Sequence, residues 1–113
     1  MHEYSIVQSL LNQCEDNAKA NNATKVLKVV VKIGVMSGVE PDLLQIAFDT
    51  FKERTMCEEA KFIMNIQSVV VKCKSCNKES ELKDNQYICP ECKSYNLEIL
   101  DGEEMFLMSL ELE

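Results

Sequence analysis

Four cysteines in the second half of the chain are spaced as ligands of one metal ion. Cys73 and Cys76 form a C-x2-C pair, and Cys89 and Cys92 form another after twelve further residues. Each pair lets two sulfurs bind from a tight turn, and the residues between the pairs suffice for a hairpin that joins them. Four thiolates select tetrahedral zinc, with an iron–sulfur centre as the lesser alternative. Because protein ligands fill all four positions, we expect a structural role.

The only histidine, His2, permits a second kind of metal chemistry. The terminal amine of Met1, the His2 amide nitrogen and its imidazole can close small chelate rings around one ion. Ni(II) and Cu(II) displace amide protons in square-planar geometry, whereas Zn(II) gains little from it. The fourth ligand would be the Glu3 amide or a carboxylate from elsewhere. The alternative interpretation is a frayed, solvated terminus.

The two remaining cysteines do not suggest catalysis. Cys14 shares the apolar stripe of a predicted helix and is expected to be a small core side chain. Cys57 lies in a polar turn beside Glu58 and Glu59 and is predicted to be a surface thiol without an activating partner. The sequence shows no nucleophile and base pair, phosphate loop or open metal site, so we do not expect an enzyme.

Two helices and three strands must position these residues. Apolar residues at helical spacing predict helices over about 5–20 and 41–54. Alternation of apolar and polar residues predicts a strand over 26–34, a second from Phe62 toward Val71 and a third at the C-terminal end. In the third strand, one apolar face is predicted to hold Phe106, Met108, Leu110 and Leu112.

These elements predict an α+β fold in which two helices cover one face of a three-stranded sheet. Residues 72–98 have few apolar side chains and four of the cysteines, so they cannot build a core of their own. We therefore expect a zinc-ribbon-like domain with four cysteine ligands, residues 71–99, inserted into a discontinuous α+β domain of residues 1–70 and 100–113. The α+β domain would hold the N-terminal metal site.

Composition and charge narrow the function classes. With 113 residues, 46% of them hydrophobic, the chain can form one ordinary core but is too short for a large multidomain enzyme. The net charge of −7 opposes capture of nucleic acid or anionic membranes. The N-terminus lacks the pattern of a secretory signal, and no apolar stretch approaches the ~20 residues that cross a bilayer. We expect a cytoplasmic protein with reduced thiols.

The same residues carry a family resemblance that spans essentially the whole chain. The start Met1–Ile6, the strand end Lys32–Gly34, the loop Gly38–Glu40 and the two C-x2-C pairs resemble HypA/HybF, the nickel metallochaperones of NiFe-hydrogenase maturation. The resemblance implies a two-site protein, with structural zinc in the inserted domain and transported nickel at the N-terminus.

The resemblance also implies ligands and partners. In the family the nickel ligands come from the Met-His-Glu start, which corresponds here to the Met1 amine, the His2 imidazole and amide, and the Glu3 amide. Glu40 occupies a loop position whose carboxylate assists in some relatives. The family works with HypB, a nickel-binding GTPase, and delivers nickel to the hydrogenase large subunit. Some members also serve urease maturation.

One departure from the family and one alternative function follow from the sequence. In some relatives a His follows a C-x2-C pair, but here Asn77 and Lys93 do, so a His-driven change of zinc ligands is not expected. The alternative function is a zinc-ribbon adaptor that binds other proteins and delivers no metal. We expect a monomer or a weak homodimer, because edge strands leave pairing with another chain open.

Overall fold

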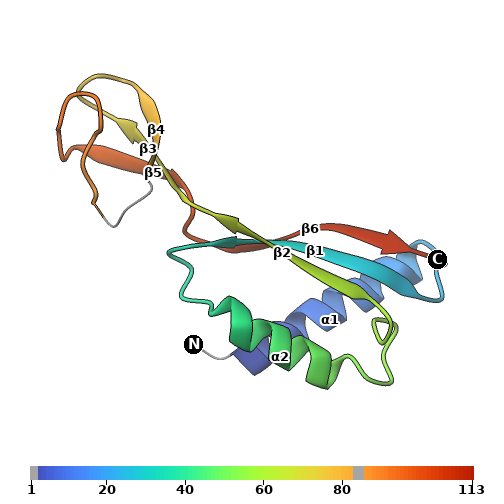
Figure 1. The fold of residues 1–113 in the computed structure, drawn as a ribbon. Coiled ribbons are helices and arrows are strands. Elements are labelled where there is room, and N and C mark those ends of the chain that lie inside the picture. Colours follow the sequence, from blue (N-terminus) through green and yellow to red (C-terminus); the bar gives the residue numbers. More distant parts are fainter. Residues whose placement is uncertain (1–2, 83–85) are drawn as a thin grey trace.

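Two three-stranded sheets follow one another along the molecule, and both helices cover one face of the first (Figure 1). The computed structural model describes residues 3–82 and 86–113, with overall dimensions of 52 × 26 × 17 Å. In chain order the elements are α1 (Glu3–Ala20), β1 (Val26–Gly34), α2 (Pro41–Phe51), β2 (Lys61–Gln67), β3 (Val69–Cys73), β4 (Glu79–Leu82), β5 (Leu97–Asp101) and β6 (Met105–Leu112). Sheet A has the order β2-β1-β6, and sheet B has the order β4-β3-β5.

The predicted fold class is confirmed, since two helices and a three-stranded sheet form one layer each and a second small sheet carries the cysteines. Within the described residues, neither helix is long and apolar enough to cross a membrane.

Helix α1 forms because its apolar residues recur every three or four positions and share one face. That face is buried in the core, with Val7, Leu10, Leu11, Cys14 and Ala18 as its members. The helix ends before Asn22, which adopts a left-handed φ of 56° that asparagine tolerates well. The helix predicted over 5–20 is confirmed and begins two residues earlier, at Glu3.

Strands β1 and β2 are parallel neighbours, and α2 is the crossover between them. Pro41 occupies the first turn of α2, where the absent N–H costs no helical hydrogen bond. On the buried side of α2, Phe48 stacks on Phe62 of β2 with ring centroids 4.3 Å apart. This aromatic pair fixes α2 against the sheet.

Helix α2 ends at Phe51, earlier than the predicted end near residue 54. The chain turns away because the Thr55 hydroxyl donates to the Lys52 carbonyl and Arg54 adopts a left-handed φ of 64°. A side chain that hydrogen-bonds nearby backbone competes with helix continuation, which explains the early end.

Strand β6 differs from the predicted pattern in the side chains that reach the core. It pairs antiparallel with β1, but Val30 lies opposite Ser109 and Val31 opposite Leu107, so Met108 is an extra residue. Such a bulge resets the alternation of faces. The prediction that Phe106 and Met108 share one face with Leu110 and Leu112 was wrong, because Phe106 and Met108 are 45% and 54% exposed whereas the two leucines pack on the core. The side chains of β6 that pack on the core are Met105, Leu107, Leu110 and Leu112.

The second predicted strand is in fact two strands that belong to different sheets. Strand β2 ends in sheet A at Gln67, and β3 begins at Val69 as the central strand of sheet B. The Gln67 carbonyl accepts from the Val35 N–H, and the Gln67 side-chain amide donates to the Ser68 carbonyl. These bonds hold the chain at the point where it changes sheets.

The two sheets meet where Gly34 and Gly102 are in close contact. A Cβ on Gly34 would lie 2.3 Å from the Gly102 carbonyl oxygen, and a Cβ on Gly102 would lie 2.8 Å from the Ser68 carbonyl oxygen. Beside them, Lys32 Nζ lies 2.8 Å from Asp101 Oδ2. The Lys32 ammonium, helped by the Gly102 N–H, holds the pKa of Asp101 below its usual range. We call these contacts the junction.

Candidate metal centres

The structure brings the four cysteines of the C-x2-C pairs together in the lobe formed by sheet B. Their Sγ atoms all lie within 4.8 Å of one another. The distances are 3.5 Å between Cys73 and Cys92 and 3.7 Å between Cys76 and Cys89. A tetrahedron with Zn–S bonds of about 2.3 Å has sulfur–sulfur edges of roughly 3.8 Å. The cluster therefore fits one tetrahedral ion.

Both C-x2-C pairs form the same kind of turn. In the first, the Cys76 amide nitrogen lies 3.5 Å from the Cys73 sulfur, and the Asn77 N–H donates to the Cys73 carbonyl at 2.8 Å. The second pair repeats both contacts around Cys89. Each turn closes because the residue after it, Asn77 or Lys93, adopts a left-handed φ near 63°.

Backbone amides in these turns stabilise the ionised form of the first cysteine of each pair, Cys73 and Cys89. The Cys76 N–H lowers the pKa of the Cys73 thiol to about 6, and the Cys92 N–H lowers the pKa of Cys89. The thiolate is the form that binds metal. Cys73 and Cys89 are buried, whereas Cys92 is exposed. The cluster can therefore accept an ion from solvent and hold it with four protein ligands, which leaves no position for a substrate.

The sequence predicted only that Asn77 and Lys93 lack the His found in some relatives. It did not predict that both residues close the cysteine turns. The available signal was the asparagine itself, which populates left-handed conformations more readily than most residues. Lys93 carries no such signal, and only the repeat of the first turn around Cys89 indicates its conformation.

The structure describes only part of the predicted nickel site. Met1 and His2 lie outside the described residues. Glu3 begins α1, and its Oε2 accepts a hydrogen bond from the Glu40 backbone N–H at 3.4 Å. Glu40 has extended backbone and immediately precedes α2. Glu3 and Glu40, 37 positions apart in the sequence, are therefore neighbours, and Figure 1 shows the start of α1 beside α2.

Cys57 is buried, which corrects the prediction of a surface thiol. Both Cys14 and Cys57 are 0% exposed and lie in the core beneath sheet A. The neighbouring Cys57 thiol, together with burial, raises the pKa of Cys14. The polar sequence around Cys57 misled the prediction, since Glu58 and Glu59 point outward while the thiol turns inward. The expected core position of Cys14 is confirmed.

A family match, similar sequences and similar solved structures all relate this chain to the same group of proteins. Residues 1–112 match the family described as "Hydrogenase/urease nickel incorporation, metallochaperone, hypA". The hydrogenase maturation factor HypA of Shewanella oneidensis is 58% identical, with 100% of this chain and 96% of the relative covered. HypA of Aquifex aeolicus is also 58% identical and is covered to 98%.

Solved structures are similar over the same length. The solution structure of the Ni metallochaperone HypA from Helicobacter pylori has a TM-score of 0.71 at 40% identity, with 99% of this chain and 97% of that chain covered. A second HypA solution structure has a TM-score of 0.76 at 39% identity, with 100% and 97% covered. Because this chain matches these proteins in both sequence and fold over nearly the full length of each, the protein belongs to the HypA family.

Proposed function

We propose that the protein is a nickel metallochaperone that binds Ni(II) at its N-terminus and delivers it during NiFe-hydrogenase maturation. The observation that carries this proposal is the match to the HypA family over residues 1–112. The proposal gives the protein a carrier role with no catalytic step. Consistent with that role, the described cysteine cluster has the donor set of a closed structural site.

Nickel would be held by the Met1 amine, the His2 imidazole and amide, and the Glu3 amide, in square-planar geometry. The contact between the Glu3 carboxylate and the Glu40 N–H supports this placement, because it holds the loop before α2 beside the start of α1. The Glu40 carboxylate would then be within the same neighbourhood as an additional ligand. Such an exposed site suits a cargo that must be released.

Zinc would occupy the cluster of Cys73, Cys76, Cys89 and Cys92. The sulfur spacing and the two matching turns support a tetrahedral ion of this size. When bound, the ion would cross-link the two turns. We also propose that residues 71–99 form the inserted zinc-binding domain and that residues 1–70 and 100–113 form the nickel-binding domain.

The proposed partners are a HypB-type GTPase, the hydrogenase large subunit and, for some tasks, urease maturation proteins, all met in the cytoplasm. The family description, which names hydrogenase and urease, supports the two recipient systems, and the GTPase is proposed from the family resemblance. Neither nucleic acid nor a membrane is a proposed partner, because the net charge of −7 disfavours both surfaces. We propose a monomer or weak homodimer.

Calorimetric titration of Ni(II) into untagged protein and into His2→Ala tests the nickel site. Loss of a direct ligand should weaken binding by more than the roughly 10–100-fold that follows loss of an outer contact. Affinity should also fall as pH drops through the imidazole pKa of about 6.5, because the ligand must be deprotonated. Gln8→Ala, on the exposed side of α1, is the matched control and should bind nickel normally.

Unchanged nickel affinity in His2→Ala would reject this site. Elemental analysis after nickel incubation then separates the remaining possibilities. A protein that holds zinc but no nickel would be an adaptor without metal delivery. A protein that still takes up nickel would carry it on other ligands.

A further inference from the structure

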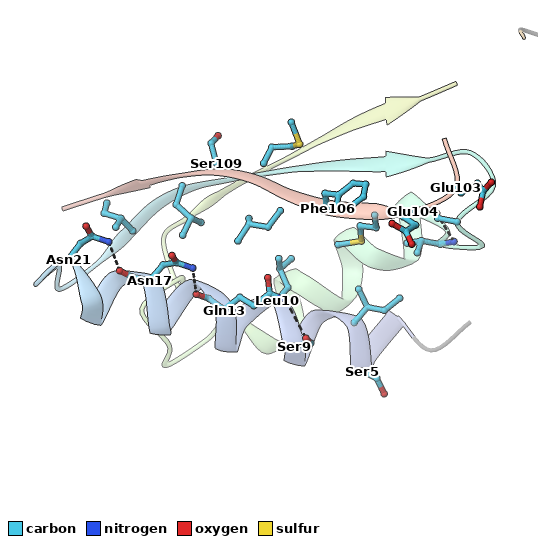
Figure 2. A pocket seen from close by; sticks show the side chains of 18 residues that line it. Ser5, Ser9, Leu10, Gln13, Asn17, Asn21, Glu103, Glu104, Phe106 and Ser109 are labelled. Carbon is cyan, nitrogen blue, oxygen red and sulfur yellow. Dashed lines mark hydrogen bonds between the residues drawn. The ribbon is translucent and has the colours of Figure 1, made fainter. Parts of the chain in front are cut away.

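A groove of about 1150 Å³ runs between α1 and β6 (Figure 2). It is somewhat larger than the roughly 300–1,000 Å³ typical of small-molecule pockets. Half-buried apolar side chains from both elements form its floor, among them Ile6, Leu107, Leu110 and Leu112. The shape and length of this groove suit a chain segment better than a compact ligand.

One wall of the groove is the free edge of sheet A. In the order β2-β1-β6, strand β6 pairs with β1 on one side only, within the part of the chain that the structure describes. An edge strand presents backbone N–H and C=O groups to which another strand can add. The bulge at Met108 divides this edge into Met105–Leu107 and Ser109–Leu112. An extended segment can satisfy several of these groups at once.

The opposite wall is a stripe of uncharged polar side chains on α1 and the turn that follows it. Its members recur every four residues and are Ser5, Ser9, Gln13, Asn17 and Asn21. Figure 2 shows them along the helix, with Asn17 and Asn21 each donating to the carbonyl one turn earlier at 2.8 Å. Hydroxyl and amide groups both donate and accept hydrogen bonds, so this wall can meet the polar groups of a peptide without demanding charge.

Charge distinguishes the two ends of the groove. Glu103 and Glu104 lie at one end, and none of the residues that line the groove is Lys or Arg. The same end includes Ser37 and Val39, which lead directly to Glu40. A segment with basic residues at this end would be favoured by charge complementarity. It would also lie near the proposed nickel-binding start of the chain.

We propose that this groove binds an extended segment of a partner protein, added as a strand to β6. The segment has apolar side chains at alternate positions, which reach the floor, and basic residues at the Glu103–Glu104 end. Antiparallel addition, the more stable pairing, places the basic residues at the C-terminal end of the segment. This inference does not depend on nickel binding.

The test uses the peptide fluorescein-(Thr-Val)3-Lys-Lys-amide and the full zinc-loaded chain. Fluorescence anisotropy measures affinity, and amide chemical shifts locate the peptide. We expect the largest shifts in β6 and along the polar stripe of α1. A peptide that ends in Glu-Glu, and the double variant Glu103→Lys with Glu104→Lys, should each weaken binding about tenfold, as expected for two exposed charge pairs.

Two tryptophan variants on α1 separate a groove from a general effect on the helix. Ser9→Trp places a large ring in the groove and should abolish peptide binding, whereas Gln8→Trp is exposed outside it and should leave binding unchanged. Equal loss in both variants, or shifts confined to sheet B, would overturn the proposal. So would a dimer in light scattering that Ser9→Trp dissociates, because a second copy would then be the occupant.

Discussion

The two lobes of the molecule show two different ways of holding a small sheet together. Sheet A is covered by two helices and a continuous apolar core that includes Val7, Leu44 and Phe48. Sheet B has only Val69, Val71 and Leu82 as buried apolar residues outside the cysteine cluster, among the residues that the structure describes. Three side chains bury too little apolar area to offset the entropy of ordering three strands. The comparison teaches that the four cysteines are the principal source of order in sheet B.

Removal of metal should have the largest effect and should act on one lobe. Chelation forfeits apparent binding free energy of about 10–16 kcal/mol, so sheet B should unfold while sheet A keeps its structure. Amide spectra should lose dispersion in β3 and β5 but not in α1. Cys73→Ser should behave in the same way, and Cys14→Ala, which leaves the cluster intact, should retain metal. Persistent order of sheet B in verified metal-free protein would contradict the comparison.

Loss of a core aromatic residue should instead destabilise sheet A and leave sheet B intact. Phe48 is 0% exposed and stacks on Phe62, so Phe48→Ala should lower the free energy of unfolding of the sheet A lobe by about 3–5 kcal/mol. Urea titration followed by helical circular dichroism measures the change, and zinc content should stay the same. Ile46→Ala, at a position on the same helix that is 58% exposed, should cost less than about 0.5 kcal/mol.

A substitution at the junction should affect both lobes together. In Gly34→Ala the new Cβ would clash with the Gly102 backbone, so overpacking should cost about 1–3 kcal/mol. Hydrogen exchange should speed up in β1 and also in β3. Gly38→Ala is the control. Gly38 has a left-handed φ of 78°, so alanine would strain the backbone there, but the added Cβ would meet no atom within 4 Å, and the effect should stay local. Exchange that changes in sheet A alone would show that the lobes are independent.

The ion pair at the junction should have the smallest effect, with a defined pH dependence. Lys32 lowers the folded-state pKa of Asp101, so the pair stabilises the fold above the unfolded-state value of about 3.9. Asp101→Asn should therefore melt a few degrees below the parent at pH 7. The difference should disappear as pH falls through the folded-state pKa, where Asp101 becomes protonated. Glu98→Gln, at an exposed acid on the same strand, should melt at the same temperature as the parent. A melting-temperature difference for Asp101→Asn that does not change with pH would show that the ion pair is not its cause.

Local patterns predicted the helices and the cysteine cluster well, because each depends on spacing within a short segment. The apolar repeat of α1 and the C-x2-C pairs are examples. The failures arose where tertiary contacts decided the outcome. The bulge at Met108 depends on pairing with Val30 and Val31, and the burial of Cys57 depends on Cys14 across the core. The change of sheets at Ser68 depends on Gly102, a close neighbour that is distant in sequence.

The candidate nickel residues show the same limit. The sequence identifies His2 by its position, and a family resemblance adds Glu3 and Glu40. Only the fold brings Glu3 against the Glu40 N–H, since nothing local to either residue predicts their contact. The ligand assignment itself stays a prediction that the titration of His2→Ala addresses.

The chain enters and leaves sheet B at two neighbouring points, Ser68 and Gly102. During folding, β6 must find β1 after the whole of sheet B has been synthesised, and the entropy lost in closing that loop grows with its length. Once sheet B is folded, its two ends already lie side by side, so the long connection between β2 and β6 no longer has to be closed at the cost of chain entropy. We therefore expect bound metal to accelerate the pairing of β6 with β1. Zinc would then act on the folding rate of a lobe whose native stability comes from its own core.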